Sequence, residues 1–110
     1  MEAGISINGF KAAFCACGLK KNNALDLALI YSEKDAVSAA VFTTNKVKAA
    51  PVLLSMENIR NGKARAIIVN AGNANACTGD QGMNNARETT RMVAENLGIS
   101  PDDVLVASTG

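Results

Sequence analysis

The chain has 110 residues, of which 48% are hydrophobic and 19% charged, and its formal net charge is +1. This length accommodates one domain, and this composition is sufficient for a globular core. The absence of histidine excludes a histidine general base, and the scarce aromatic residues and interspersed charges argue against nucleic acid as a partner.

Three short apolar segments in the first half of the chain are predicted to be strands. Residues 10–17 are small and apolar, residues 25–31 are rich in aliphatic side chains, and residues 36–43 form the third segment. Polar turns at residues 20–23 and 32–35 separate these segments. Such spacing is typical of an antiparallel meander.

Helices and strands are predicted to alternate in the second half of the chain. A helix over residues 51–61 begins with proline, which is favoured at the first helical position. A strand over 64–69, a helix over 80–97 and a strand over 104–107 follow. The order is therefore β-β-β-α-β-α-β, and we expect an α+β fold in which helices pack on a mixed sheet.

The predicted helix over residues 80–97 is amphipathic. Its charged side chains lie largely on one face, where Glu88 and Arg91 form an i,i+3 pair worth a few tenths of a kcal/mol. We expect the opposite face to pack against the sheet, and it comprises Met83, Ala86, Thr90, Val93, Ala94 and Leu97.

The segment between the strand over 64–69 and this helix is Asn70-Ala-Gly-Asn-Ala-Asn-Ala-Cys-Thr-Gly79. Asparagine and glycine tolerate positive φ angles, and asparagine side chains bond nearby backbone groups, so such a loop closes tightly. It lacks the G-x-x-x-x-G-K-[ST] spacing of a phosphate-binding loop. We interpret it as a structural loop that braces the wall of a site, with direct contact to a substrate as the alternative.

The cysteines and the hydropathy pattern indicate a cytoplasmic location. Cys15, Cys17 and Cys77 form no C-x-x-C pair, and an odd number of cysteines without a secretory signal is typical of reduced thiols. No apolar run approaches the roughly 20 residues of a membrane span. We therefore expect a cytoplasmic protein with three reduced structural thiols, no bound metal and no membrane contact.

Three strings carry a resemblance to a known family. They are Phe42-Thr-Thr-Asn-Lys-Val-Lys-Ala-Ala-Pro-Val52, the loop over residues 70–79, and Val106-Ala-Ser-Thr-Gly110. In this order they resemble the ornithine acetyltransferase family, the bifunctional glutamate N-acetyltransferases of arginine biosynthesis. The resemblance implies half of a layered sandwich. It also implies that residues 1–110 are the N-terminal part of the first, or alpha, subunit, and we expect a truncated fragment of that subunit.

The resemblance also implies a reaction and a site. Family members move an acetyl group from N-acetylornithine to glutamate without a bound cofactor, and some also accept acetyl-CoA as a co-substrate. Their precursor cleaves itself at an Ala-Thr bond, and the freed threonine is the N-terminal nucleophile of a second, or beta, subunit. By this resemblance, the Thr109 hydroxyl and the Gly110 backbone N–H form the oxyanion hole.

This chain contains no match to the cleavage motif, so we expect the nucleophile and the substrate-clamping residues to lie outside it. We expect a homo-oligomer of alpha–beta units, and we expect the 110 residues alone to be inactive. Two alternatives stay open: a related N-terminal-nucleophile amidase or aminopeptidase, and a non-catalytic α+β module that binds a small ligand or oligomerises. In the module, Thr109 and Gly110 would be an ordinary strand-end turn.

Overall fold

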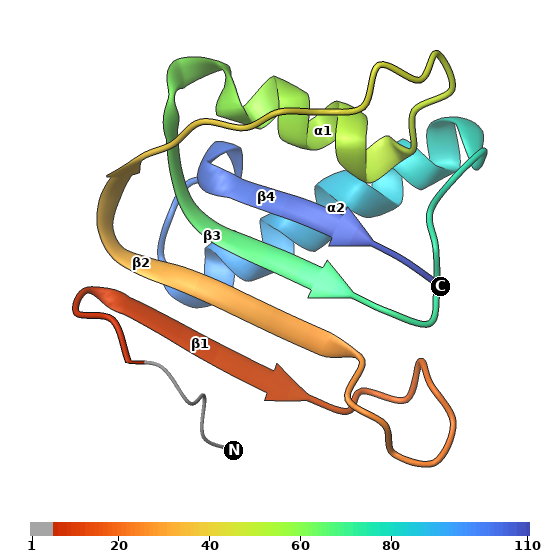
Figure 1. The fold of residues 1–110 in the computed structure, drawn as a ribbon, viewed down its shortest axis with the longest axis horizontal. Helices are drawn as coiled ribbons and strands as arrows, with labels where there is room; N and C mark the ends of the chain where they lie inside the picture. The colour runs from red at the N-terminus through yellow and green to blue at the C-terminus, as the bar shows by residue number, and fades with distance from the viewer. Residues whose placement is uncertain (1–5) are drawn as a thin grey trace.

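The computed structural model describes residues 6–110. Its helices and strands are β1 (Phe10–Cys15), β2 (Leu27–Val37), α1 (Ala50–Asn58), β3 (Lys63–Asn70), α2 (Gly79–Leu97) and β4 (Val104–Ser108), and the 3₁₀ turns are η1 (Ile59–Asn61) and η2 (Pro101–Asp103). The four strands form one sheet in the order β1-β2-β3-β4 (Figure 1). β1, β2 and β3 pair antiparallel, whereas β3 and β4 pair parallel. The predicted α+β fold with a mixed sheet is confirmed.

The core lies between one face of the sheet and the helices α1 and α2. Because strand side chains alternate between the two faces, every second residue of β3 and β4 points toward the helices. Leu54 of α1 and Val104 of β4 are the largest fully buried side chains. Burying such a side chain stabilises the fold by about 1.5–3 kcal/mol. The rest of the core consists of Ala50, Ala66, Ile68, Ala86, Ala94 and Val106.

Helix α1 packs along the outer edge of β4, the last strand of the sheet. The Ser55 hydroxyl donates to the carbonyl of Val106 at 2.9 Å and accepts from the N–H of the same residue at 3.1 Å. The Asn58 amide donates to the carbonyl of Val104 at 3.0 Å. These side chains satisfy backbone groups that an edge strand leaves unpaired. As a result β4 is held on both sides, by β3 and by α1.

The predicted strand over residues 36–43 is wrong, and the order of elements is β-β-α-β-α-β. The structure has the single strand β2 where we predicted two strands joined by a turn. Pairing of β2 with β3 ends at Val37, opposite Lys63, where β3 begins. Residues 38–43 therefore have no neighbouring strand to pair with, and they run as irregular backbone.

The predicted turn at residues 32–35 is a bulge inside β2. The register against β3 shifts between Tyr31 and Ala36, which leaves the residues between them outside the ladder. The Arg65 side chain takes the place of the missing ladder bonds. It donates to the carbonyls of Ser32 at 2.9 Å and of Glu33 at 2.7 Å.

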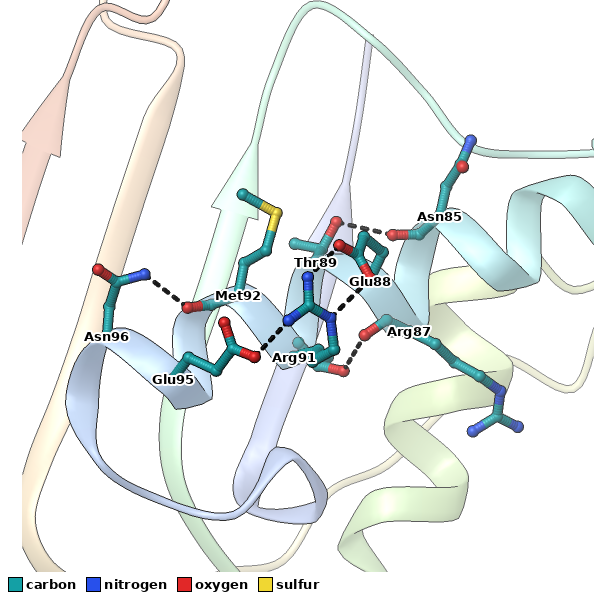
Figure 2. Close-up of polar contacts among 9 residues, drawn as sticks. Asn85, Arg87, Glu88, Thr89, Arg91, Met92, Glu95 and Asn96 are labelled. Carbon is teal, nitrogen blue, oxygen red and sulfur yellow. Dashed lines mark hydrogen bonds and ion pairs between the residues drawn. The ribbon is translucent and has the colours of Figure 1, made fainter.

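The two faces of α2 are as predicted. Ala86, Thr90 and Ala94 are buried, and Met83, Val93 and Leu97 pack against the core. On the opposite face the Arg91 guanidinium lies between Glu88 and Glu95 and bonds both carboxylates (Figure 2). These pairs are exposed and contribute at most a few tenths of a kcal/mol each.

The second face of the sheet carries no helix among residues 6–110. It exposes Phe10, Phe14, Ile30 and Ile67, whose exposed fractions are 47%, 39%, 45% and 36%. An apolar face of this kind is expected of one half of a layered sandwich. In the part of the chain that the structure describes, no helix is long and apolar enough to span a membrane.

Candidate functional site

Thr109 directly follows β4 and is held by its own backbone. Asn70 and Ser108 are register partners at the ends of the parallel strands β3 and β4. Beyond them, the N–H of Thr109 donates to the carbonyl of Asn70 at 3.0 Å, and the N–H of Asn73 donates to the carbonyl of Thr109 at 3.1 Å. The backbone of Thr109 is thus tied to the end of β3 and to the loop that follows β3.

Gly110 lies directly against the same loop. A Cβ atom at this position would lie 2.5 Å from the nitrogen of Asn73, 2.8 Å from the carbonyl carbon of Gly72 and 2.9 Å from the nitrogen of Ala74. All three atoms belong to the backbone and cannot turn away, so only glycine fits here. Thr109 and Gly110 are both exposed, and in Figure 1 the C-terminus lies beside the segment that leaves β3.

The Asn70 side chain links the two strand ends to the loop. Its Oδ1 accepts a hydrogen bond of 2.6 Å from the Ser108 hydroxyl, and its Nδ2 donates to the carbonyl of Asn73 at 2.9 Å. The first bond joins β3 to β4 through side chains, and the second closes the turn after β3. This is the bonding of asparagine to nearby backbone that we predicted for this segment.

The second half of the loop is attached to the first turn of α2. The Asn75 amide donates to the carbonyl of Gly82 at 2.8 Å, and the Thr78 hydroxyl donates to Oδ1 of Asn75. The side chains of Asn75 and Thr78, like that of Asn70, are therefore engaged in local contacts, which favours the structural interpretation over direct contact with a substrate. Residues 71–78 form the loop, and Gly79 begins the helix.

A cavity of about 340 Å³ lies between the loop, the sheet and α2. Its lining mixes apolar side chains of the sheet with amides and hydroxyls. Ser108 lines it, whereas Thr109 and Gly110 do not. The polar lining residues are Asn70, Asn73, Asn75, Thr78, Asn85, Thr89 and Ser108.

Asp26 is a residue near the site that sequence reasoning missed. Its side chain is buried, with 3% of the residue exposed. The carboxylate accepts hydrogen bonds from the N–H groups of Cys17 at 2.7 Å, Leu19 at 2.6 Å and Lys20 at 3.0 Å. These bonds, above all the one from Cys17, hold the pKa of Asp26 well below its usual range. Its own carbonyl accepts from the N–H of Ala71 at 2.9 Å.

Cys15, Cys17 and Cys77 are free thiols, as predicted. All three are exposed. A hydrogen bond with Asp26 raises the pKa of the Cys17 thiol. Among residues 6–110, no three side chains of the types that bind metals lie close enough together to hold an ion.

Comparison with known sequences places the chain in a family. The model of the ArgJ family matches residues 11–110. The "Arginine biosynthesis bifunctional protein ArgJ" of Geobacter sulfurreducens is 58% identical over 106 residues, and its namesake from Caldanaerobacter subterraneus is 56% identical over 102 residues. These alignments cover 96% and 93% of this chain but 27% and 25% of the relatives. The chain therefore spans about a quarter of the length of these relatives.

Comparison with solved structures agrees. The crystal structure of the ArgJ protein of Bacillus halodurans is 44% identical to this chain with a TM-score of 0.89, and the match covers 94% of this chain and 54% of the Bacillus chain. The crystal structure of the ornithine acetyltransferase of Mycobacterium tuberculosis, in complex with ornithine, is 45% identical with a TM-score of 0.91. That match covers 94% of this chain and 56% of the Mycobacterium chain. The fold and the family recognised from the three strings are thus confirmed, and the chain belongs to the ArgJ family of arginine biosynthesis.

Proposed function

We propose that this chain forms part of an acetyltransferase that moves an acetyl group from N-acetylornithine to glutamate. The observation that carries the proposal is the fixed turn of Thr109 and Gly110 at the end of β4, beside the loop from β3. Membership of the ArgJ family supports it, as does the ornithine bound to the relative from Mycobacterium tuberculosis.

In the proposed reaction, a threonine at the N-terminus of a beta subunit attacks the acetyl carbonyl carbon, and its own amine takes the hydroxyl proton. A bond forms between the threonine oxygen and the carbonyl carbon, and the carbonyl oxygen becomes negatively charged. Collapse of this intermediate breaks the carbon–nitrogen bond, and ornithine leaves with the proton on its amine. The amine of glutamate then attacks the acetyl-threonine in the same way and frees the threonine.

Thr109 and Gly110 are assigned to the negatively charged oxygen. The Thr109 hydroxyl and the Gly110 N–H donate hydrogen bonds to it as it forms. Hydrogen-bond donors that are already in place stabilise such a transition state without reorganisation, and removal of one costs roughly 3–4 kcal/mol. The backbone bonds of Thr109 and the glycine-only contact of Gly110 are the features that would hold these donors in place.

The proposal extends to the remainder of the enzyme. The beta subunit supplies the nucleophile, and alpha–beta units assemble into a homo-oligomer in the cytoplasm. No bound cofactor takes part, and acetyl-CoA serves as an alternative acetyl donor of bifunctional members. Substrate-clamping residues lie outside this chain.

The test is Thr109→Ala in the full-length gene product. We expect kcat to fall about 100- to 1000-fold with a smaller change in KM, because the hydrogen bond strengthens only in the transition state. Thr109→Ser should retain more activity because it keeps the hydroxyl, and Thr44→Ala, an exposed threonine outside the site, is the control. Wild-type kcat in correctly cleaved Thr109→Ala would contradict the proposal. Release of free acetate in place of N-acetylglutamate would favour the amidase alternative.

A further inference from the structure

We infer that Asp26 is a positioning residue for the turn of Thr109 and Gly110, acting through two backbone segments that contact each other. Asp26 does not reach the proposed oxyanion site itself. It precedes β2, whereas Thr109 and Gly110 follow β4. The catalytic consequence of this inference rests on the proposed function, but the structural part does not.

The first of the two segments is residues 17–20, which the Asp26 carboxylate holds. Both carboxylate oxygens are used, and the three N–H groups that donate to them come from one short stretch of backbone. Hydrogen bonds to a charged acceptor are about twice as strong as those between neutral groups. The low pKa of Asp26 keeps this acceptor charged at neutral pH. The carboxylate therefore sets the path of residues 17–20.

The second segment is residues 72–74, which lies against the first. A Cβ atom on Gly72 would lie 2.9 Å from Cγ of Lys20 and 3.2 Å from the carbonyl carbon and oxygen of Leu19. The φ angle of Gly72 is +92°, a backbone conformation that residues other than glycine rarely adopt. The two backbones thus approach as closely as glycine allows.

The same second segment also contacts Gly110. A Cβ atom on Gly110 would meet backbone atoms of Gly72, Asn73 and Ala74 within 3 Å. Residues 72–74 thus contact residues 17–20 through Gly72 and also contact Gly110. The backbone carbonyl of Asp26 also accepts from the N–H of Ala71, the residue before this segment. The Asp26 carboxylate therefore holds residues 17–20, and its backbone holds the residue at which the loop begins.

A purely structural role for Asp26 makes a different prediction from a positioning role. If the carboxylate only stabilised the whole fold, its loss would loosen every part of the chain equally. If it positions the turn, its loss would loosen residues 17–20 and 71–74 and leave the central strand β3 unchanged. Amide hydrogen exchange separates these cases, because local opening and global unfolding affect different sets of amides.

The experiment is hydrogen exchange by mass spectrometry on the full-length gene product with Asp26→Asn. Asparagine has nearly the same shape but only one acceptor oxygen, and it carries no charge. We expect exchange in residues 17–20 and 71–74 to accelerate about tenfold or more, with residues 65–69 unchanged. Asp102→Asn is the matched control, because Asp102 is exposed and lies before β4, at the end of the strand away from Thr109. Uniform acceleration, or no change, would overturn the inference.

A second variant covers the case in which Asp26→Asn does not fold. Gly72→Ala leaves the Asp26 carboxylate intact. Its added methyl group would collide with Leu19 and Lys20 and so push residues 17–20 and 72–74 apart. We expect it to accelerate exchange at Asn73, whose N–H is bonded to Thr109. Unchanged exchange at Asn73 would show that this contact does not restrain the turn, and the inference would fail.

A kinetic measurement connects the positioning to the proposed function. We expect Asp26→Asn to lower kcat about tenfold with less change in KM, and we expect its effect in a Thr109→Ala background to be smaller than in wild type. Equal effects in both backgrounds would show that Asp26 does not act through the Thr109 donor. If Thr109→Ala itself leaves kcat unchanged, the proposed function fails, whereas the exchange result still decides the positioning.

Discussion

The carbonyl of Thr109 accepts a hydrogen bond of 3.1 Å from the N–H of Asn73, so the residue after β4 is tied to the loop that leaves β3. β3 and β4 run parallel, and their carboxyl ends therefore meet at one edge of the sheet. Residues separated by more than thirty positions in the sequence are adjacent there.

Gly110→Ala should reduce both activity and stability. The added methyl group would lie within 3 Å of backbone atoms in Gly72, Asn73 and Ala74, so the turn or the loop must move. We expect a lower kcat and a lower Tm in the full-length gene product. Gly98→Ala is the control: Gly98 has a positive φ, +69°, but a Cβ there meets no atom within 4 Å. It should lower Tm through backbone strain without lowering kcat, and equal kcat losses in the two variants would contradict the site assignment.

Asn70→Ala should destabilise the protein by about 1–3 kcal/mol. It removes two hydrogen bonds, one to Ser108 and one to Asn73, each worth roughly 0.5–1.5 kcal/mol. Asn70→Asp should also be less stable than wild type: a carboxylate can still accept from the Ser108 hydroxyl, but it cannot donate to the carbonyl of Asn73 and is repelled by it. Urea unfolding measures both changes. Asn96→Ala removes an exposed bond to Met92 on α2 (Figure 2) and should stay within about 0.5 kcal/mol of wild type. A loss for Asn70→Ala as small as that of Asn96→Ala would be evidence against the bridging role of Asn70.

Much of the fold can be predicted from the sequence because it follows from local periodicity. Helix α2 is predicted nearly to the residue, since its small and apolar side chains recur every three or four positions over five turns. The bulge in β2 cannot be predicted in this way. Its residues have the composition of a turn, and the side chain that holds it, Arg65, lies 33 positions after Ser32.

The candidate site, too, can be predicted from the sequence only in part. Thr109 and Gly110 could be predicted as site residues because a short sequence string, residues 106–110, carries the family resemblance. The packing of residues 72–74 against Gly110 and residues 17–20 could not, because it depends on three segments that only the folded chain brings together. One signal for Asp26 was present: it is an aspartate between Leu25 and Leu27, and a carboxylate within an apolar run requires partners when it is buried.

The Cys17 thiol should react faster when Asp26 is neutral. Its hydrogen bond with the Asp26 carboxylate raises the pKa of Cys17 and suppresses the thiolate, the species that attacks alkylating reagents. In Asp26→Asn we expect the midpoint of the pH–rate profile for iodoacetamide at Cys17 to shift to lower pH. Peptide mass spectrometry resolves the cysteines, and Cys77, also exposed, is the internal reference. A midpoint that does not shift would show that the carboxylate does not influence this thiol.

The stability of the protein should fall below about pH 4, and Asp26 should account for part of that loss. The pKa of Asp26 is lower in the folded protein than the value of about 3.9 expected in the unfolded chain. The unfolded state therefore binds the proton first as the pH falls, so the stabilisation is complete above about pH 4 and decreases progressively below it. Urea unfolding of wild type and Asp26→Asn between pH 6 and pH 2 measures the difference. We expect the variant to be less stable at pH 6 and the two stabilities to converge toward pH 2. Parallel curves across this range would show that the Asp26 carboxylate has the same pKa folded and unfolded, and that its three backbone hydrogen bonds do not favour the charged form.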